Sequence, residues 1–139
     1  MRWVNGLIIS CLVDTDVCID FLREREYART LFGKWLAKGL LSISAITHLE
    51  IYAGMRKGEE SATGDFLDNM VTIPVDESVA CSAGNIIRHL KGKGLTMSPM
   101  DSIIAASALF TNVPLITNNI DDYPVSAISG LVVVKGIEK

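Results

Sequence analysis

The stretch LVDTDVCIDFL, residues 12–22, places three aspartates directly behind an apolar run. The residues before it, LIISC at 7–11, are typical of a buried β-strand because they are almost all apolar. Asp14, Asp16 and Asp20 then follow, with apolar residues between them. A buried strand that ends in negative charge predicts either a cap for the next helix or a functional site at the edge of a sheet.

Apolar strands alternate with helical patterns along the rest of the chain. Asp16 is a candidate N-cap for the first helix, and Gly39 and Gly58 are stop signals for later helices. Short apolar strands separated by helices predict an α/β fold whose central, mostly parallel sheet has helices on both faces. The predicted strands cover residues 7–13, 40–44, 71–75, 113–117 and 131–134, and the predicted helices cover 16–22, 27–38, 45–57, 66–70, 77–90 and 99–110.

The composition predicts a folded, well-buried protein. The chain has 139 residues, of which 49% are hydrophobic and 21% charged, so we expect a single domain over residues 1–139. No apolar run reaches the roughly 18 residues that span a bilayer, and we expect no signal peptide. The net charge of −3 lacks the basic surplus usual in nucleic-acid-binding proteins, although an acidic site for cations would also lower the net charge.

The cysteines indicate a reducing compartment. Cys11, Cys18 and Cys81 are odd in number, form no CxxC pair and lie in apolar stretches. This predicts neither a disulfide framework nor a zinc site, but three small hydrophobic side chains in a cytoplasmic protein. The sequence also contains no GxGxxG or Walker A stretch, so we predict no nucleotide cofactor.

Asp14 stands at the end of the first predicted strand, where two interpretations are open. It is either a cap of the next helix or a metal ligand or nucleophile at the carboxyl edge of the sheet. For Asp16 the cap is favoured, and Asp20 fits an exposed helical position with no role.

Glu50 lies in the third predicted helix beside an apolar stripe. At about 100° per residue Glu50 falls at the edge of the stripe, next to Ile46, so two directions are open for its carboxylate, toward the sheet or into water. Helical glutamates are otherwise usually solvated. The stripe consists of Ala45, Ile46, Leu49, Tyr52 and Ala53.

Asp101 lies at the start of the last long predicted helix. Ser98 is the expected N-cap, Pro99 the first helical residue, and an acid three residues after the cap is itself typical of a helix start. However, Asp101 is in line with the apolar face of Ile104, Ala105 and Ala108. A carboxylate over a buried face requires a partner, and a bound cation is one such partner.

The two acids Asp121 and Asp122 follow a predicted strand and two asparagines, where ordinary turn chemistry also explains them. Taken together, however, acids recur at strand ends and on apolar helix faces. Clustered carboxylates repel one another unless a cation lies between them. Because all these donors are oxygens, the sequence predicts Mg²⁺ or Mn²⁺, which commonly serve phosphoryl chemistry.

Four stretches, in this order, resemble the PIN-domain ribonucleases, and most of all the VapC toxins of toxin–antitoxin modules. They span residues 12–123, and they are LVDTDVCIDFL (12–22), SAITHLEIYAG (44–54), MSPMDSIIAASAL (97–109) and LITNNIDDY (115–123). The resemblance implies a PIN-like fold and metal-dependent endonucleolytic cleavage of RNA.

The resemblance also implies which residues form the site. It assigns Asp14, Glu50 and Asp101 to an acidic core that binds Mg²⁺ or Mn²⁺. For the fourth acid, alignment on the residue before the aromatic gives Asp122, and alignment after Thr-Asn gives Asn119; Asp122 is preferred. Nearby polar residues are expected to support the ligands, namely Thr15, Asp16, Thr117 and Asn119.

The family further implies partners. A PIN ribonuclease of this kind is expected to act on RNA, to form a homodimer and to be blocked by a small antitoxin of the VapB type, with no membrane partner.

Two other functions remain open from the sequence. In a phosphatase of the haloacid-dehalogenase type, Asp14 would be the nucleophile and Asp16 the general acid–base, but Cys18 stands where that motif has Thr or Val, and the chain is short for that fold. In a non-catalytic binding module of the same fold, the acids would only cap helices.

Overall fold

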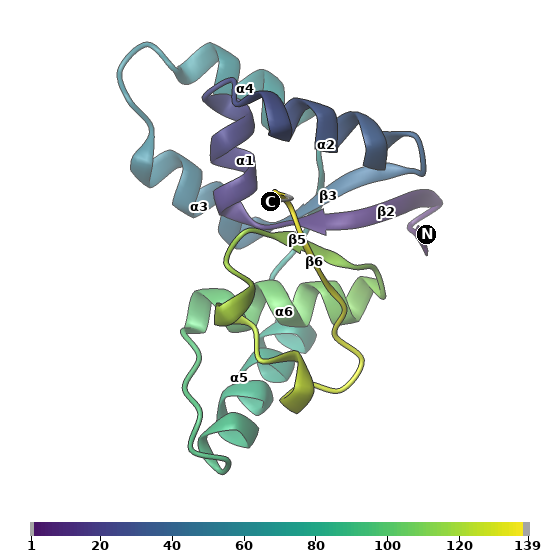
Figure 1. Cartoon of the computed structure of the whole chain (residues 1–139), viewed down its shortest axis with the longest axis vertical. Helices are drawn as coiled ribbons and strands as arrows, with labels where there is room; N and C mark the ends of the chain where they lie inside the picture. Colours follow the sequence, from purple (N-terminus) through teal and green to yellow (C-terminus); the bar gives the residue numbers. More distant parts are fainter. Residues whose placement is uncertain (1, 138–139) are drawn as a thin grey trace.

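The computed structural model describes residues 2–137, and the side chains from residue 4 onward; residues 1, 138 and 139 of the predicted domain lie outside it. Strands and helices alternate along most of the chain (Figure 1). The strands are β1 (Arg2–Val4), β2 (Leu7–Val13), β3 (Leu40–Ser44), β4 (Val71–Ile73), β5 (Leu115–Thr117) and β6 (Val133–Lys135). The helices are α1 (Thr15–Leu22), α2 (Glu26–Leu36), α3 (Ala45–Gly54), α4 (Glu60–Asp68), α5 (Glu77–Lys91) and α6 (Pro99–Thr111), with the short 3-10 helices η1 (Ile120–Asp122) and η2 (Val125–Ala127).

The sheet has the strand order β4-β3-β2-β5-β6, and all five of these strands are parallel. The predicted α/β fold with a mostly parallel sheet is therefore confirmed. Strand β2 is central, so its residues are buried on both faces, which explains its almost continuous apolar run. Because β2 and β5 are neighbouring parallel strands, their carboxyl ends meet at one edge of the sheet.

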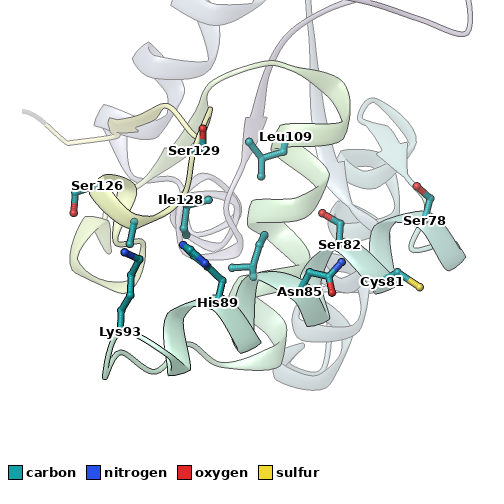
Figure 2. A pocket seen from close by; sticks show the side chains of 12 residues that line it. Ser78, Cys81, Ser82, Asn85, His89, Lys93, Leu109, Ser126, Ile128 and Ser129 are labelled. Atoms are coloured by element: carbon teal, nitrogen blue, oxygen red, sulfur yellow. The ribbon is translucent and has the colours of Figure 1, made fainter.

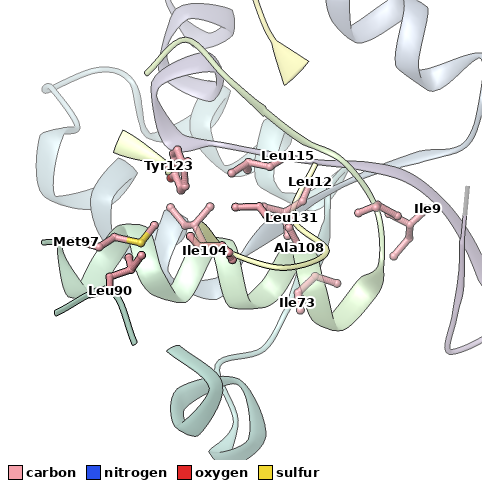
Figure 3. Close-up of a cluster of buried hydrophobic side chains, with 13 residues drawn as sticks. Ile9, Leu12, Ile73, Leu90, Met97, Ile104, Ala108, Leu115, Tyr123 and Leu131 are labelled. Carbon is pink, nitrogen blue, oxygen red and sulfur yellow. The ribbon is translucent and has the colours of Figure 1, made fainter. Parts of the chain in front are cut away.

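Helices cover both faces of this sheet (Figure 1). Helices α1, α2 and α4 pack over one face, in a cluster that includes Val13, Val17 and Phe32. Helices α5 and α6 pack over the other, in a cluster that includes Leu12, Ile104 and Tyr123 (Figure 3). The sheet lies between these two cores. The segments after β2 and β5 leave the sheet side by side, at the carboxyl ends of its strands.

An irregularity in β2 sets which side chains face which core. The pairing with β3 shifts register between Ile9 and Cys11. Ile9 belongs to the α6 side although it is two residues from Cys11, which belongs to the α1 side. Past this point the alternation is regular, with Leu12 on the α6 side and Val13 on the α1 side. The following residue, Asp14, leaves the sheet at its edge.

Several predicted boundaries were wrong. Helix α2 ends at Leu36 rather than at residue 38, and α3 ends at Gly54 rather than at residue 57. The predicted helix 66–70 is only the end of α4, and the last two strands are shorter or shifted. Gly39 is required for a different reason than a helix stop: a Cβ there would lie 3.1 Å from the backbone of both Ile8 and Ser10 in β2.

Strand β1 was not predicted. It pairs antiparallel with the first half of β2 through a tight turn at Asn5 and Gly6, whose φ angles are 49° and 81°. Two consecutive positive φ angles are the requirement of a type I′ hairpin turn, which Asn-Gly satisfies best. The Asn-Gly pair is therefore the sequence signal for this hairpin.

The cysteines divide into two kinds. Cys11 and Cys18 are buried, as expected, but Cys81 on α5 is exposed, so its apolar neighbours in the sequence did not predict its environment. All three are free thiols. Among the residues that the structure describes, none of the helices has the length and apolar character that crossing a bilayer requires.

Candidate functional site

Asp14 is the N-cap of α1. Its backbone is extended (φ −70°, ψ 156°), and its Oδ1 atom accepts a hydrogen bond of 2.8 Å from the backbone N–H of Thr15. The prediction that Asp16 caps this helix was wrong, because α1 begins one residue earlier, at Thr15, and Asp16 lies inside its first turn. Asp14 thus has the capping role and the strand-end position together, and its side chain is only 6% exposed.

The second carboxylate oxygen of Asp14 is held by two hydroxyl groups. Oδ2 accepts hydrogen bonds from Thr117 Oγ1 at 2.8 Å and from Tyr123 Oη at 2.9 Å. Burial, followed by the negative charge of Asp16, raises the pKa of Asp14 to about 6 despite these three donors. A buried carboxylate with a raised pKa at a sheet edge is typical of a functional site.

Asp101 lies in the first turn of α6. As predicted, Ser98 caps this helix, and its Oγ accepts a hydrogen bond of 3.1 Å from the Asp101 N–H. The side chain is partly buried, and its Oδ1 atom lies 3.4 Å from Tyr123 Oη. Burial raises the pKa of Asp101, and the negative charge of Asp122 raises it further. The structure therefore brings Asp14 and Asp101 to the same hydroxyl from two distant segments.

Glu50 reaches the site from α3. Its Oε1 atom accepts a hydrogen bond of 2.6 Å from Thr15 Oγ1, which also lies 3.0 Å from Thr47 Oγ1. Glu50 is thus connected to Asp14 through Thr15, the residue whose N–H Asp14 binds.

The apolar stripe predicted for α3 was wrong. Leu49 and Tyr52 are 52% and 53% exposed, whereas Thr47 and Ile51 are buried. The helix turns the hydroxyl of Thr47 toward α1 and leaves Leu49 and Tyr52 on the outside. Glu50 nevertheless points inward, because it lies beside the face that actually packs.

The segment after β5 carries the remaining candidates. Asn119 and Asp122 are both exposed, and the Asn119 backbone N–H donates to Thr117 Oγ1 at 3.0 Å. Of the two candidates for the fourth acid, Asp122 is the one whose charge acts on Asp101. Thr117 itself is fully buried, and its hydrogen bond to Asp14 links this segment directly to that residue.

Asn118 anchors the same segment to the rest of the fold. Its backbone N–H donates to Asp16 Oδ2 at 2.9 Å, its Nδ2 to Tyr27 Oη at 2.6 Å, and its Oδ1 accepts from the Ile137 N–H at 2.8 Å. Tyr27 in turn donates to Asp20. The expectation that Asp20 is an exposed residue without a role was therefore wrong, because its partly buried side chain supports this network.

Asp16 is partly buried beside the site. Burial raises its pKa, and its Oδ1 atom is buried with no hydrogen-bond partner. A buried carboxylate oxygen without a partner is costly, and a nearby cation would offset that cost.

Tyr123 is the residue that sequence reasoning missed. Its side chain is 2% exposed and lies in the core beside Leu12 and Leu115 (Figure 3). Burial and the charges of Asp14 and Asp101 raise its pKa, so the hydroxyl keeps its proton and acts as a donor. The signal in the sequence is an aromatic with a hydroxyl directly after the acidic pair, but only the fold places it between two distant aspartates.

The chemistry of these residues fits a hard divalent cation, although the structure does not gather them around one point. Within residues 2–137, no three acidic, imidazole or thiol side chains are close enough to hold one ion together. Glu50 is instead bound to Thr15, and Asp14 and Asp101 to Tyr123. The donors are all oxygens, burial raises the pKa of Asp14, Asp16 and Asp101, and Asp16 also has a buried oxygen without a hydrogen-bond partner. An all-oxygen set of this kind suits a hard divalent cation.

A hollow of about 780 Å³ lies elsewhere, between α5 and the segment around η2 (Figure 2). Asn85 and His89 from α5, and Lys93 from the turn that follows it, line the hollow together with Ser126 and Ser129. Because no carboxylate contributes to its lining, this hollow is not the acidic site.

The fold and the site define an α/β protein with an acidic centre at the carboxyl edge of a parallel sheet. A model of the PIN domain matches residues 11–125. Ribonuclease VapC10 of Mycobacterium tuberculosis is 31% identical over 113 residues, which cover 81% of this chain and 85% of that protein. Ribonuclease VapC1 of Methanocaldococcus jannaschii is 31% identical over 109 residues, covering 78% and 74%. The chain therefore belongs to the PIN-domain family, and within it to the VapC group.

Solved structures agree on the fold. A toxin–antitoxin complex from Klebsiella pneumoniae matches with a TM-score of 0.78 at 28% identity, covering 94% of this chain and 100% of that one. VapBC2 from Rickettsia felis, bound to a promoter DNA fragment, matches with a TM-score of 0.81 at 22% identity, covering 92% and 98%. At that identity the second match speaks for the fold alone. The PIN-like fold expected from the four motifs is confirmed.

Family membership also counts against one of the functions left open, the phosphatase. The PIN family implies dependence on a divalent metal ion. The phosphatase alternative is not supported by the family match, and in the structure Asp16, its required acid–base, instead accepts a hydrogen bond from the Asn118 backbone.

Proposed function

We propose that this protein is a metal-dependent endoribonuclease, the toxin of a type II toxin–antitoxin pair, formed by a single PIN-like domain over residues 1–139. The observation that carries the proposal is the meeting of Asp14 and Asp101 at the Tyr123 hydroxyl. The Asp14 carboxylate is buried and the Asp101 carboxylate is partly buried, and the two residues are 87 positions apart in the sequence. They meet where burial makes a negative charge costly. Such convergence is expected of a cation site rather than of two independent helix caps.

The proposed ligands are the four acids, with Mg²⁺ or Mn²⁺ as the ion. Asp14 and Asp101 hold the cation, and Glu50 and Asp122 complete the cluster directly or through water. When bound, the ion supplies a water of lowered pKa and neutralises charge on the phosphate and the leaving oxygen. The exposed position of Asp122 fits a ligand that is reached from the solvent side.

The chain's own residues orient these groups. Thr117 and the Thr15 N–H hold the two oxygens of Asp14, so its carboxylate plane is fixed before substrate arrives. The Thr15 hydroxyl holds Glu50 in the same way, which places a carboxylate to receive a proton from the attacking water. In hydrolysis the water oxygen bonds to phosphorus, the P–O bond to the leaving ribose oxygen breaks, and that oxygen takes up a proton. Asn119 and Asp16 support the segment after β5 through the Asn119 N–H and the Asn118 N–H.

The proposed partners follow from the family. VapC relatives are named ribonucleases, and matching structures are toxin–antitoxin complexes. We accordingly propose RNA as substrate, a small VapB-type antitoxin as inhibitor, a homodimer as the assembled form, and the cytoplasm as location, which the three free thiols support.

The test is cleavage of a mixed RNA pool by the purified protein with Mg²⁺, with Mn²⁺ and with EDTA. Asp101→Asn is compared with Asp68→Asn, a control at an exposed position on α4. We expect metal-dependent cutting that EDTA and Asp101→Asn abolish and that Asp68→Asn leaves intact. Metal-independent cutting, full activity of Asp101→Asn, or a phosphorylated Asp14 trapped from a generic phosphate ester would each contradict the proposal.

A further inference from the structure

Tyr123 has two properties that together suggest a function for it. Its ring is fixed, because the side chain is 2% exposed and packs with Leu12, Ile104 and Leu115 in the core over α6. Its polar hydroxyl oxygen lies at the edge of that core, 2.9 Å from Asp14 Oδ2 and 3.4 Å from Asp101 Oδ1. A buried tyrosine hydroxyl normally has a partner, but here both candidate partners are carboxylates of the proposed metal site.

The hydroxyl approaches the two aspartates from the core, whereas a cation and its waters arrive from the solvent. Tyr123 cannot swing aside to admit the ion without opening a close-packed cluster, so its hydroxyl remains beside the carboxylates when the site is loaded. An ionised carboxylate offers about four lone-pair positions. Asp14 uses three of them, for Thr15, Thr117 and Tyr123, which leaves Asp14 with a free position for a cation.

We propose that Tyr123 is a positioning residue for the metal ion: its hydroxyl orients the carboxylates of Asp14 and Asp101 so that both present oxygens to one cation. This rests on the proposed function, since it assumes that these two aspartates are ligands. The hydroxyl has one hydrogen, and the shorter distance assigns it to Asp14. Its contact with Asp101 then limits how far the side chain at the start of α6 turns away. Groups that hydrogen-bond metal ligands commonly tune affinity in this manner.

The decisive variant is Tyr123→Phe, which removes the hydroxyl and keeps the ring. Mn²⁺ is titrated into the metal-free protein by calorimetry, so that the readout is binding and not turnover. We expect the dissociation constant for Mn²⁺ to rise about tenfold. Tyr52→Phe is the matched control, because it removes a phenol hydroxyl from an exposed side chain on α3, and it is expected to bind Mn²⁺ as the wild type does.

Thermal unfolding without metal reports whether Tyr123→Phe is folded. A second measurement needs no variant: the Tyr123 hydroxyl proton is followed by NMR in the wild type, with and without diamagnetic Mg²⁺. We expect its slowly exchanging resonance to persist when the site is saturated.

The outcomes separate the two proposals. Failure of the wild type to bind Mn²⁺ or Mg²⁺ overturns the proposed metal site itself. Wild-type binding with unchanged or tighter binding by folded Tyr123→Phe overturns only the role of Tyr123, and tighter binding would identify the hydroxyl as a competitor of the ion. Loss of the hydroxyl resonance on Mg²⁺ saturation would likewise overturn it, because the bond would have been given up to admit the cation.

Discussion

Thr117 Oγ1 donates a 2.8 Å hydrogen bond to Asp14 Oδ2 across 103 positions of sequence. This bond joins the ends of the neighbouring parallel strands β2 and β5, which pair through Val13 and Ile116. Thr117 also accepts the Asn119 N–H, so one fully buried hydroxyl orients the first aspartate and starts the segment that leads to Asp122. The candidate site is therefore built directly on the strand pairing.

Replacing Thr117 by valine separates this role from simple stability. Thr111 is a matched control, because it is equally buried but its hydroxyl bonds only to the carbonyls of Ser107 and Ala108 in its own helix. Each valine variant is expected to lower the free energy of unfolding by about 1–2 kcal/mol. Only Thr117→Val should also lower kcat for RNA cleavage, by at least about tenfold. Equal losses of activity in the two folded variants would contradict a positioning role.

Asp14 should make the metal-free protein less stable at neutral pH. Its pKa is raised to about 6 in the folded protein, so the folded state binds more protons than the unfolded state between about pH 4 and 6, and stability falls as the pH rises through that range. Asp14→Asn removes this penalty and is expected to raise the free energy of unfolding at pH 7 by about 3 kcal/mol while abolishing cleavage. Denaturant titrations at several pH values measure it. The gain should vanish below about pH 4; a pH-independent gain would point to another cause.

Metal binding should weaken in acid, because the pKa of Asp14 is raised to about 6. A carboxylate must lose its proton before it coordinates a cation. With a pKa of about 6 at Asp14, the apparent affinity for Mn²⁺ should fall about twofold from pH 7 to 6 and about fivefold from pH 6 to 5. Calorimetric titrations at these three pH values provide the measurement, and an affinity that does not change across them would show that Asp14 is not a ligand.

Gly136 should tolerate no side chain. A Cβ there would lie 2.7 Å from Asn118 Oδ1 and 3.2 Å from Val17 Cγ2, in the network that anchors the segment after β5. Gly136→Ala is expected to cost about 1–3 kcal/mol of stability. Gly84→Ala, in open space on α5, should instead stabilise by about 0.5–1 kcal/mol. Thermal unfolding compares the two, and a neutral Gly136→Ala would show that Asn118 yields easily.

The elements that sequence predicted best are those fixed by local rules. Strand β3 begins and ends where the apolar run 40–44 does, and α6 begins where Ser98 and Pro99 indicate. The inward position of Asp101 followed from the same periodicity, because α6 is apolar nearly all round and Ile104, Ala105 and Ala108 are indeed buried.

The failures have tertiary causes. On α3 the apolar side chains at Leu49 and Tyr52 are on the outside, because the packed face is set by Thr47, whose hydroxyl meets Thr15 of another helix. Tyr123 is a site residue only because the fold brings the ends of β2 and η1 next to the start of α6. Neither relationship is encoded in the periodicity of a single segment. The roles assigned to the four acids stay predictions until metal binding is measured.

The unequal environments of the cysteines make the native protein easy to label at one place. Burial raises the pKa of both Cys11 and Cys18 and shields them from reagents, whereas Cys81 on α5 is exposed. A maleimide dye should therefore attach once to the folded chain and three times to the unfolded chain. The unaltered sequence thus supplies one attachment site for a fluorescent dye, on α5. The rate at which the second and third labels attach reports how often the protein opens enough to expose Cys11 and Cys18.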